Sequence, residues 1–224
     1  AWAYFGYWGD HQIAYLHRLL EASDRFRPGA LERGLGRAVH SYADVPYRIV
    51  PYAEMVEDPK HTIVFDHDRQ AAVDERVARL GEDGRLLPAP DGGIHRASLA
   101  EKLLVPALSK LSNFVAGGGI WMNTQRPEWN DANNALVGNG VSMVTLLYLR
   151  DYLAFLEGLF DRAGDGEVPV AGRVLAWLDG VEEAFAAHSG LLDGPIDPAG
   201  RRSLLDALGE AFSEYRLAAY DHGP

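Results

Sequence analysis

Apolar residues recur along most of this chain at the spacing of one helical face. After Asp10, a residue type that favours helix N-caps, positions 13, 16, 17 and 20 form such a face, and Pro28-Gly29 closes the segment. This pattern predicts a helix over about residues 10–24. The same spacing predicts further helices over about residues 30–42, 51–57, 69–80, 98–114, 141–160, 170–188 and 198–220. Gly34 and Gly36 weaken the second helix, and Pro106 should kink or break the fifth.

One short run has the composition of a β-strand. The segment from His61 to Phe65 is the only β-branched run, and it is too isolated along the chain to predict a sheet. Residues 81–93 contain four glycines and two prolines and predict a loop. The three glycines at 117–119 predict a flexible connector. The pattern as a whole is that of an all-α chain.

The apolar run from Val141 to Phe160 predicts the strongest helix. Its apolar residues nearly encircle it, so we expect this helix in the interior of a layered bundle, as the structural centre of the chain. Several antiparallel helices can form either a plain bundle or a ring of helical hairpins, the α/α toroid. Sequence spacing by itself favours neither arrangement.

Composition narrows the possible partners. The 224 residues are 47% hydrophobic, which suits a sizeable core, and we treat 1–224 as a single helical domain. A net charge of -11 without a Lys/Arg cluster disfavours nucleic acid as a partner. Arg150, Asp151 and Glu157 interrupt the longest apolar run, so no membrane span is predicted. The absence of cysteine excludes disulfides and thiolate sites but leaves localisation open, with a small preference for the cytoplasm.

The N-terminus has the composition of a domain interior. The first eight residues, Ala1 to Trp8, include five aromatic side chains and lack the basic region and the small-residue cleavage site of a signal peptide. We therefore expect the chain to be a fragment of a larger polypeptide, and we expect the rest of that polypeptide to be its partner.

The richest candidate chemistry lies between Pro127 and Asn134. Trp129 offers a flat apolar face on which a pyranose ring can stack, and Asp131 offers a transferable proton. The side-chain amides around them, including that of Asn130, can bind sugar hydroxyls or hold the carboxyl group in place. This combination predicts a site that cleaves a sugar linkage.

The same segment carries a resemblance to a known family. Glu128-Trp129-Asn130-Asp131, followed by Gly138-Asn139-Gly140-Val141-Ser142-Met143, resembles the Asp-Trp-Asn-Asp-Gly and Gly-Lys-Gly-Glu-Ser pair of the cellobiose and chitobiose phosphorylases, within the six-hairpin glycosidase-like enzymes. Trp8-Gly9-Asp10-His11 is similar to the Ser-Asp-Asp segment of that family. Val45-Pro46-Tyr47 and Val50-Pro51-Tyr52 stand where the family has a Pro-Tyr segment. The match covers roughly residues 7–160.

The resemblance implies an α/α toroid, or part of one, and an inverting glycosidase or glycoside phosphorylase of carbohydrate metabolism. Asp131 corresponds to the general acid, which would protonate the glycosidic oxygen while inorganic phosphate or an activated water attacks the opposite face. Such a donor needs a raised pKa, and Glu128 is close enough in sequence to raise it. Hydrolysis also needs a second carboxylate about 6.5–9.5 Å away. Asp10 is one candidate, but the equivalent segment of the resembling family binds sugar, so we assign Asp10 contacts with substrate hydroxyls instead.

The resemblance also implies the substrate contacts. Its sugar-binding segment corresponds to Trp8, Asp10 and His11, and its motif residues to Glu128, Trp129 and Asn130, so we expect all six to bind an oligosaccharide. The chain departs from the family at Glu128, at Ala132 in place of Gly, and at Val141 in place of a substrate-binding Glu. No equivalent of the family's phosphate-binding residues is found. The resemblance therefore favours membership of the wider six-hairpin glycosidase-like group over phosphorolysis as the activity.

Plainer interpretations exist for these residues. Asp10 could serve only as a helix cap, the Asn and Asp residues around 131 could form a simple turn, and Trp129 could be an ordinary core residue. His11 and His17 suit surface or packing positions. The alternative to an enzyme is a non-catalytic helical domain that binds saccharide or mediates assembly.

Other chemistries lack their signatures. The chain has no Gly-x-Ser-x-Gly, no His-Glu-x-x-His and no P-loop, and we expect neither a cofactor nor a metal. One cluster has ligand types suited to divalent cations, namely His61, Asp66, His67 and Asp68, although a solvated turn explains that spacing better. The glycines at 117–119 could cradle a phosphate only if a helix followed, and Ile120-Trp121-Met122 does not predict one.

Overall fold

The computed structural model describes residues 10–123 and 137–222, apart from the side chains of residues 10, 11, 221 and 222. Within these ranges the α-helices are α1 (Asp10–Phe26), α2 (Ala30–Gly34), α3 (Tyr52–Glu57), α4 (His67–Leu80), α5 (Leu99–Leu111), α7 (Met143–Ala163), α8 (Gly172–Ala187) and α9 (Pro198–His222). Two 3-10 helices, η2 (Gly81–Arg85) and η3 (Ser189–Leu192), follow α4 and α8. The helical periodicity of the sequence therefore located most of the helices correctly.

Five short strands make the chain a mixed α/β structure. Strands β1 (Tyr47–Ile49) and β2 (Ile63–Phe65) pair antiparallel, with Arg48 opposite Val64. A second antiparallel sheet has the order β3 (Phe114–Val115), β4 (Gly119–Trp121) and β5 (Val141–Ser142). The expectation of an all-α toroid is therefore wrong. The sequence argument failed because the strand partner of residues 61–65 lies 14 or more positions away, beyond the reach of local periodicity.

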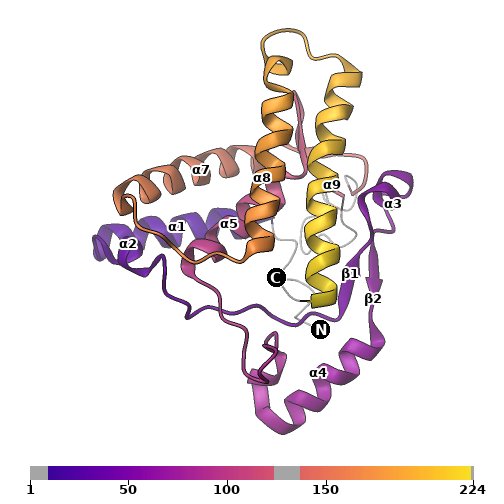
Figure 1. The fold of residues 1–224 in the computed structure, drawn as a ribbon. Coiled ribbons are helices and arrows are strands. Elements are labelled where there is room, and N and C mark those ends of the chain that lie inside the picture. Colours follow the sequence, from indigo (N-terminus) through magenta and orange to yellow (C-terminus); the bar gives the residue numbers. More distant parts are fainter. Residues whose placement is uncertain (1–9, 124–136, 223–224) are drawn as a thin grey trace.

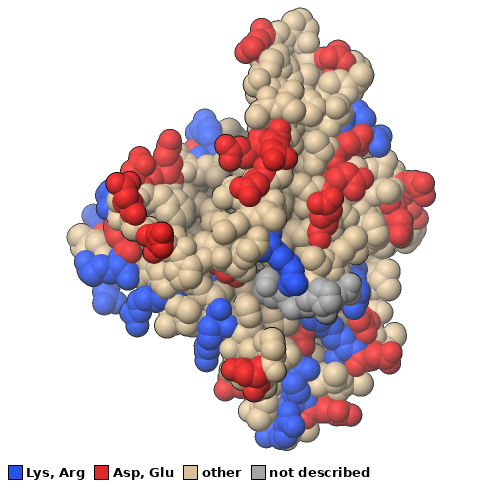
Figure 2. Space-filling view, viewed as in Figure 1, with Lys and Arg blue, Asp and Glu red and all other residues tan. Residues whose placement is uncertain are grey.

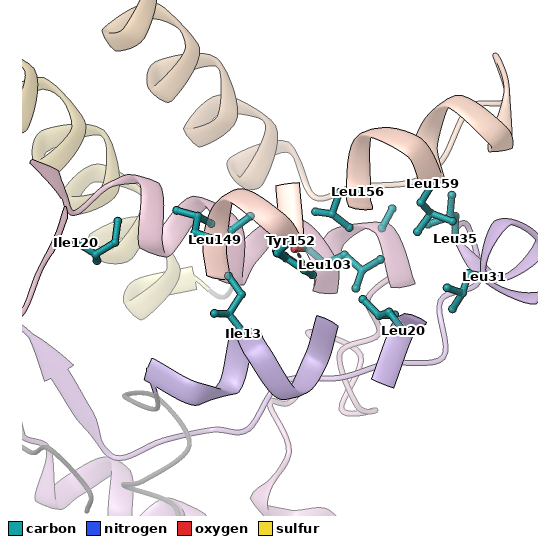
Figure 3. Packing of buried hydrophobic residues seen from close by; sticks show 12 residues of the cluster. Ile13, Leu20, Leu31, Leu35, Leu103, Ile120, Leu149, Tyr152, Leu156 and Leu159 are labelled. Carbon is teal, nitrogen blue, oxygen red and sulfur yellow. Dashed lines mark hydrogen bonds between the residues drawn. The ribbon is translucent and has the colours of Figure 1, made fainter. Parts of the chain in front are cut away.

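The first hydrophobic core lies between α1, α2, α5 and α7 (Figure 3). Ile13 and Leu20 of α1 meet Leu149 and Tyr152 of α7, and Leu103 of α5 packs among them (Figure 3). The hydroxyl of Tyr152 donates a 2.9 Å hydrogen bond to the backbone oxygen of Leu103, so its one polar atom is satisfied inside the core. His17 is also buried here, against Phe155, which confirms its packing role.

The second core joins α5 to α8 and α9. Leu108 of α5, Val174 and Trp177 of α8, and Leu204 and Leu208 of α9 are buried together. Figure 1 shows α8 and α9 as a long antiparallel pair that extends away from the layer of α1, α5 and α7. Because α5 contributes to both cores, α5 lies at the centre of the fold.

Helix α7 is half exposed rather than enclosed. One side carries Tyr152 and Leu159 into the first core, whereas Val144, Leu147 and Tyr148 are exposed. The expectation that this helix is the structural centre is therefore wrong. Its apolar residues do surround the helix, but only one side meets other elements of the described chain. No helix within the described ranges combines the length and apolar character needed to cross a membrane.

The predicted helix over residues 30–42 is only one turn and a half long. Helix α2 ends at Gly34, and the chain then runs extended beside residues 86–97, with isolated bridges from His40 to Ala97 and from Ala43 to Leu86. The backbone oxygen of Leu35 accepts instead from Ala100 of α5. The two glycines noted in the sequence fall where this helix ends, and long-range backbone hydrogen bonds replace the helical ones.

Candidate functional site

Most of the site predicted from the sequence lies outside the described residues. This holds for Trp8, Glu128, Trp129, Asn130 and Asp131. Asp10 and His11 form the first turn of α1, but their side chains lie outside the described part as well. The roles assigned to these seven residues stay predictions.

The two ends of the segment that carries Asp131 are held close together. The amide of Gly138 donates a 2.5 Å hydrogen bond to the backbone oxygen of Met122, and Trp121 Nε1 donates to the oxygen of Gly138 at 3.2 Å. On the other side, Asn123 is buried and accepts at its backbone oxygen from Thr62 Oγ1 at 2.9 Å. These bonds join residues 121–123 to Gly138 and Thr62.

A cavity of about 350 Å³ lies where α1, α4, α5 and α9 approach the extended segment 42–45. We call it the Tyr215 cavity. Its aromatic lining consists of Tyr42, Trp177, Phe212, Tyr215 and Tyr220, and its cationic lining consists of Arg69, Lys102 and Arg216. The volume falls near the lower end of the range of roughly 300–1,000 Å³ that is typical of small-molecule sites. A cavity of this size suits a single ring-sized ligand.

The aromatic wall is rigid because its rings stack on one another. Trp177 lies 4.6 Å from Phe212 and 4.4 Å from Tyr215 between ring centroids, with interplanar angles of 4° and 17°. Trp177 Nε1 donates to Ser112 Oγ at 3.0 Å, which fixes the indole in its plane. Phe212 and Tyr215 share one face of α9, so a single helix presents two of the rings.

A buried carboxylate holds the opposite wall in place. Glu101 accepts a 2.6 Å hydrogen bond from the hydroxyl of Tyr42 at one oxygen and a 2.9 Å bond from the amide of Ala171 at the other. Its own amide donates to Ser98 Oγ, the N-cap of α5. Burial and the bond to Glu101 raise the pKa of Tyr42, so this phenol stays a hydrogen-bond donor at neutral pH.

Lys102 follows Glu101 in the sequence, lines the cavity and lies over the ring of Tyr42. Its ammonium is 3.8 Å from the ring centroid of Tyr42, which is a cation–π contact. Burial lowers the pKa of Lys102, and the nearby charge of Glu101 opposes that shift. Within the described residues, the ammonium forms no hydrogen bond or ion pair.

The two arginines of the lining are already engaged. Arg69 Nε donates to Asp44 at 2.5 Å, and Arg76 donates to the other oxygen of the same carboxylate. Arg216 donates to the backbone oxygen of Val50 at 3.2 Å and lies over the ring of Phe212. These guanidinium groups build the wall and are held by protein acceptors.

Two phenols complete the lining. Tyr220 accepts a 3.0 Å hydrogen bond from the amide of Ile49, which ties the end of α9 to β1. Burial raises the pKa of Tyr215, and in the described part of the chain its hydroxyl has no hydrogen-bond partner. The hydroxyl of Tyr215 and the ammonium of Lys102 are thus donors that a ligand could use.

The cavity adjoins the described ends of the segments singled out in the sequence. Gln12, two residues from Asp10, lines it, and so does Val45 of the Val45-Pro46-Tyr47 segment. Asn123, at the start of the undescribed segment, donates to Asn113 Oδ1 at 2.5 Å, and Asn113 donates to the backbone oxygen of Ser109 at 2.8 Å. Ser109 also lines the cavity. Three regions far apart in sequence are therefore linked to one cavity.

Sequence reasoning missed the residues that form this cavity. Glu101 and Lys102 were passed over, although Ser98 and Glu101 have the spacing of a capping box, which marks a helix start. The aromatic residues at 212, 215 and 220 fall on one face of α9 and could have been recognised as an aromatic stripe. Nothing in the sequence indicated that this stripe lines the same cavity as Tyr42.

The other sequence candidates are engaged in local contacts in the described structure. His61 contacts Asp58 at 2.8 Å, Asp66 caps α4 by accepting from the amide of Arg69, and His67 packs on the ring of Phe65. The described residues hold no group of three His, Asp or Glu side chains arranged for a metal. The glycines at 117–119 form the hairpin between β3 and β4, where a Cβ on Gly119 would lie 2.8 Å from the backbone oxygen of Ser142.

Charge distinguishes the cavity from the surface around it. On the face seen in Figure 2, acidic side chains spread over α8 and α9. The Tyr215 cavity, in contrast, has three cationic side chains in its lining and no carboxylate among the described residues.

No protein-family model and no curated protein matches the chain.

Proposed function

We propose that this chain supplies the substrate site of an enzyme that cleaves a glycosidic bond with inversion. The observation that supports the proposal is that the Tyr215 cavity is lined by, or linked to, residues that belong to or adjoin three sequence segments resembling parts of a disaccharide phosphorylase. Gln12 and Val45 line the cavity, and Ser109 connects it through Asn113 to Asn123. Stacked aromatic rings with a few polar donors are the lining that a pyranose ring requires.

In the proposed reaction Asp131 protonates the leaving glycosidic oxygen. A nucleophile attacks the anomeric carbon from the opposite face, so the configuration inverts. In this proposal Trp129 and the first turn of α1 bind the sugar, and Asn130 and Glu128 make further substrate contacts. Glu128 keeps Asp131 protonated by repulsion between the two carboxyl groups.

The nucleophile is either inorganic phosphate or a water molecule activated by a carboxylate. Glu101 is unsuited to the role of base, because both of its oxygens already accept hydrogen bonds from Tyr42 and Ala171. Phosphate needs no carboxylate base, and the described lining of the cavity is free of carboxylates. The same observation favours the second candidate function, a domain that binds saccharide without cleaving it.

The test of the acid is Asp131→Asn in the whole protein, assayed on a panel of disaccharides with and without phosphate. We expect the variant to lose roughly 100-fold or more in kcat, because a general acid contributes about that much. Saccharide binding should persist, since Asn retains the shape of Asp. The control is Asp151→Asn, an exposed carboxylate on α7 that bonds only Arg150 among the described residues, and it should leave kcat unchanged.

The products separate the remaining alternatives. A sugar 1-phosphate that forms only when phosphate is present indicates phosphorolysis, whereas a free reducing sugar without phosphate indicates hydrolysis. If the wild-type protein binds saccharides but turns over none of the panel, the enzyme proposal is overturned in favour of the binding domain. Equal kcat for wild type and Asp131→Asn would remove Asp131 from the mechanism.

A further inference from the structure

Within the described part of the chain, two polar groups that line the Tyr215 cavity have no hydrogen-bond partner and can donate, namely the ammonium of Lys102 and the hydroxyl of Tyr215. Arg69 is held by Asp44, and Arg216 donates to Val50. Among the described residues, the ammonium of Lys102 makes a cation–π contact with Tyr42 and no hydrogen bond or ion pair, and the hydroxyl of Tyr215 has no hydrogen-bond partner. A ligand that supplies acceptors can therefore use both groups as donors.

Among the described residues, the lining of the cavity holds no counter-charge for Lys102. No carboxylate lines it among the described residues. The nearest one, Glu101, attracts the ammonium but forms no ion pair with it, and its two oxygens are already used by Tyr42 and Ala171. A partly buried ammonium without an acceptor is unfavourable, because it has lost water and gained only a ring face in return. An anionic group on the ligand would supply both the missing counter-charge and the missing hydrogen-bond acceptor.

The volume of the cavity suits a small ligand. The volume of about 350 Å³ admits one ring with its substituents. Tyr42 and Tyr215 offer aromatic surface, and Trp177 fixes the orientation of Tyr215 by stacking at 4.4 Å. The ring faces favour a flat or pyranose ring, and the donors favour an acidic substituent on it.

We propose that the Tyr215 cavity binds a single sugar ring that carries an anionic substituent, with the ammonium of Lys102 as its counter-charge and the hydroxyl of Tyr215 as a second donor. The sugar part of this inference rests on the proposed function. The anionic part rests on the described lining alone. A carboxylate and a phosphate ester share the required chemistry, as does free inorganic phosphate, so the experiment must separate these three.

The test measures binding by calorimetry, without any turnover. Four probes are titrated into the wild-type protein: glucuronate, glucose 6-phosphate, glucose and inorganic phosphate. We expect at least one of the two anionic sugars to bind at least about tenfold more tightly than glucose, because a charge-assisted hydrogen bond contributes on that scale. Inorganic phosphate should bind more weakly than that sugar, since it cannot use the aromatic wall.

Two variants assign the effect to residues. Lys102→Met keeps the length of the side chain and removes its charge, and Tyr215→Phe removes one hydroxyl while preserving the stack on Trp177. Each should weaken binding of the anionic sugar, Lys102→Met by about tenfold or more and Tyr215→Phe by less, while glucose binding changes little. Lys60→Met, an exposed lysine outside the cavity, is the matched control and should leave every affinity unchanged. Lys102→Arg should retain part of the preference, because it keeps the charge.

The possible results separate this inference from the proposed function. Equal affinity for glucose and both anionic sugars, or a preference that survives in Lys102→Met, overturns the inference. Tight binding of inorganic phosphate with no gain from the sugar ring overturns the sugar part and leaves an anion site. If Asp131→Asn loses turnover but binds the four probes with unchanged affinity, the result bears on the proposed function and not on this inference. The thermal unfolding midpoint of each variant must match the wild type for its affinity to count.

Discussion

The hydroxyl of Tyr42 donates a 2.6 Å hydrogen bond to the buried carboxylate of Glu101, 59 residues further along the chain. The second carboxylate oxygen accepts from the amide of Ala171, at the start of α8. One side chain of α5 thereby joins the extended segment before β1 to the helix pair α8 and α9. The Tyr215 cavity lies along this junction, with Tyr42 as part of its wall.

Replacing this carboxylate should weaken the whole fold. In Glu101→Gln, the side-chain amide can still accept from Tyr42 but presents donors to the amide of Ala171, so one buried donor loses its partner. We expect the free energy of unfolding to fall by roughly 1–3 kcal/mol in urea denaturation. The matched control is Glu182→Gln on the exposed side of α8, which should change stability by less than about 0.5 kcal/mol. Equal stability of the two variants would show that Glu101 does not hold the junction.

A close approach between α9 and α3 provides a second prediction. Gly209 lies against the ring of Tyr52, and a Cβ at Gly209 would be 2.2 Å from Cδ2 and Cε2 of that ring. Tyr52 is buried and donates to Asp206 at 2.5 Å, so the ring has little room to move. We expect Gly209→Ala to destabilise the protein by roughly 1–3 kcal/mol, because the ring or the helix must shift.

A second helical glycine supplies the control for this substitution. At Gly158 of α7, an added Cβ would meet only the end of the Arg162 side chain, at 3.6 Å. Gly158→Ala should therefore stabilise the protein by roughly 0.5–1 kcal/mol, through the higher helix propensity of Ala. Thermal unfolding of both variants measures the difference. A stabilising effect of Gly209→Ala would contradict the contact between α9 and Tyr52.

Buried phenols should make the fold sensitive to alkaline pH. Burial is the main cause that raises the pKa of five of the ten tyrosines in the chain, namely Tyr42, Tyr52, Tyr152, Tyr215 and Tyr220. A folded pKa above the unfolded value of about 10 means that the unfolded state releases protons first. The stability that these phenols contribute is complete below about pH 10 and is lost as the pH rises towards their folded pKa values.

Absorbance at 295 nm, which follows phenolate formation, tests this expectation together with circular dichroism. We expect part of the absorbance change above pH 10 to occur in one steep step that coincides with the loss of helical signal. In guanidinium, the same tyrosines should titrate smoothly near pH 10. Smooth titration of all ten phenols in the folded protein, with an unchanged helical signal, would be incompatible with the buried positions of these five.

The local spacing of apolar residues predicted where the helices lie, but it predicted their ends only in part. The spacing at positions 13, 16, 17 and 20 placed α1, and the strong periodicity after residue 140 placed α7, α8 and α9. The segment 30–42 was predicted as a helix because its composition permits one, yet the chain leaves the helix at Gly34 to bond with residues 86–100. Residues 61–65 were correctly recognised as strand-like but wrongly left without a partner, which is β1.

The candidate site, too, was predictable from the sequence only in part. The sequence identified Trp129 and Asp131 by residue type and resemblance, and those roles stay predictions because the positions lie outside the described residues. The cavity could not be predicted from the sequence, because its lining includes Tyr42, Lys102 and Tyr215. Each of these residues lies at least 60 positions from the next one along the chain. No local pattern connects three such positions.

The sequence by itself determined what depends on neighbours a few residues apart: where helices form, which of their faces are apolar, and that the chain is acidic and free of cysteine. The tertiary structure decided what depends on residues far apart: that α5 rather than α7 is central, that two small sheets form, and that Glu101 joins Tyr42 to Ala171. The physical reason is the range of the forces. Helical hydrogen bonds close within four residues, whereas strand pairing and the burial of rings depend on which distant segments come together.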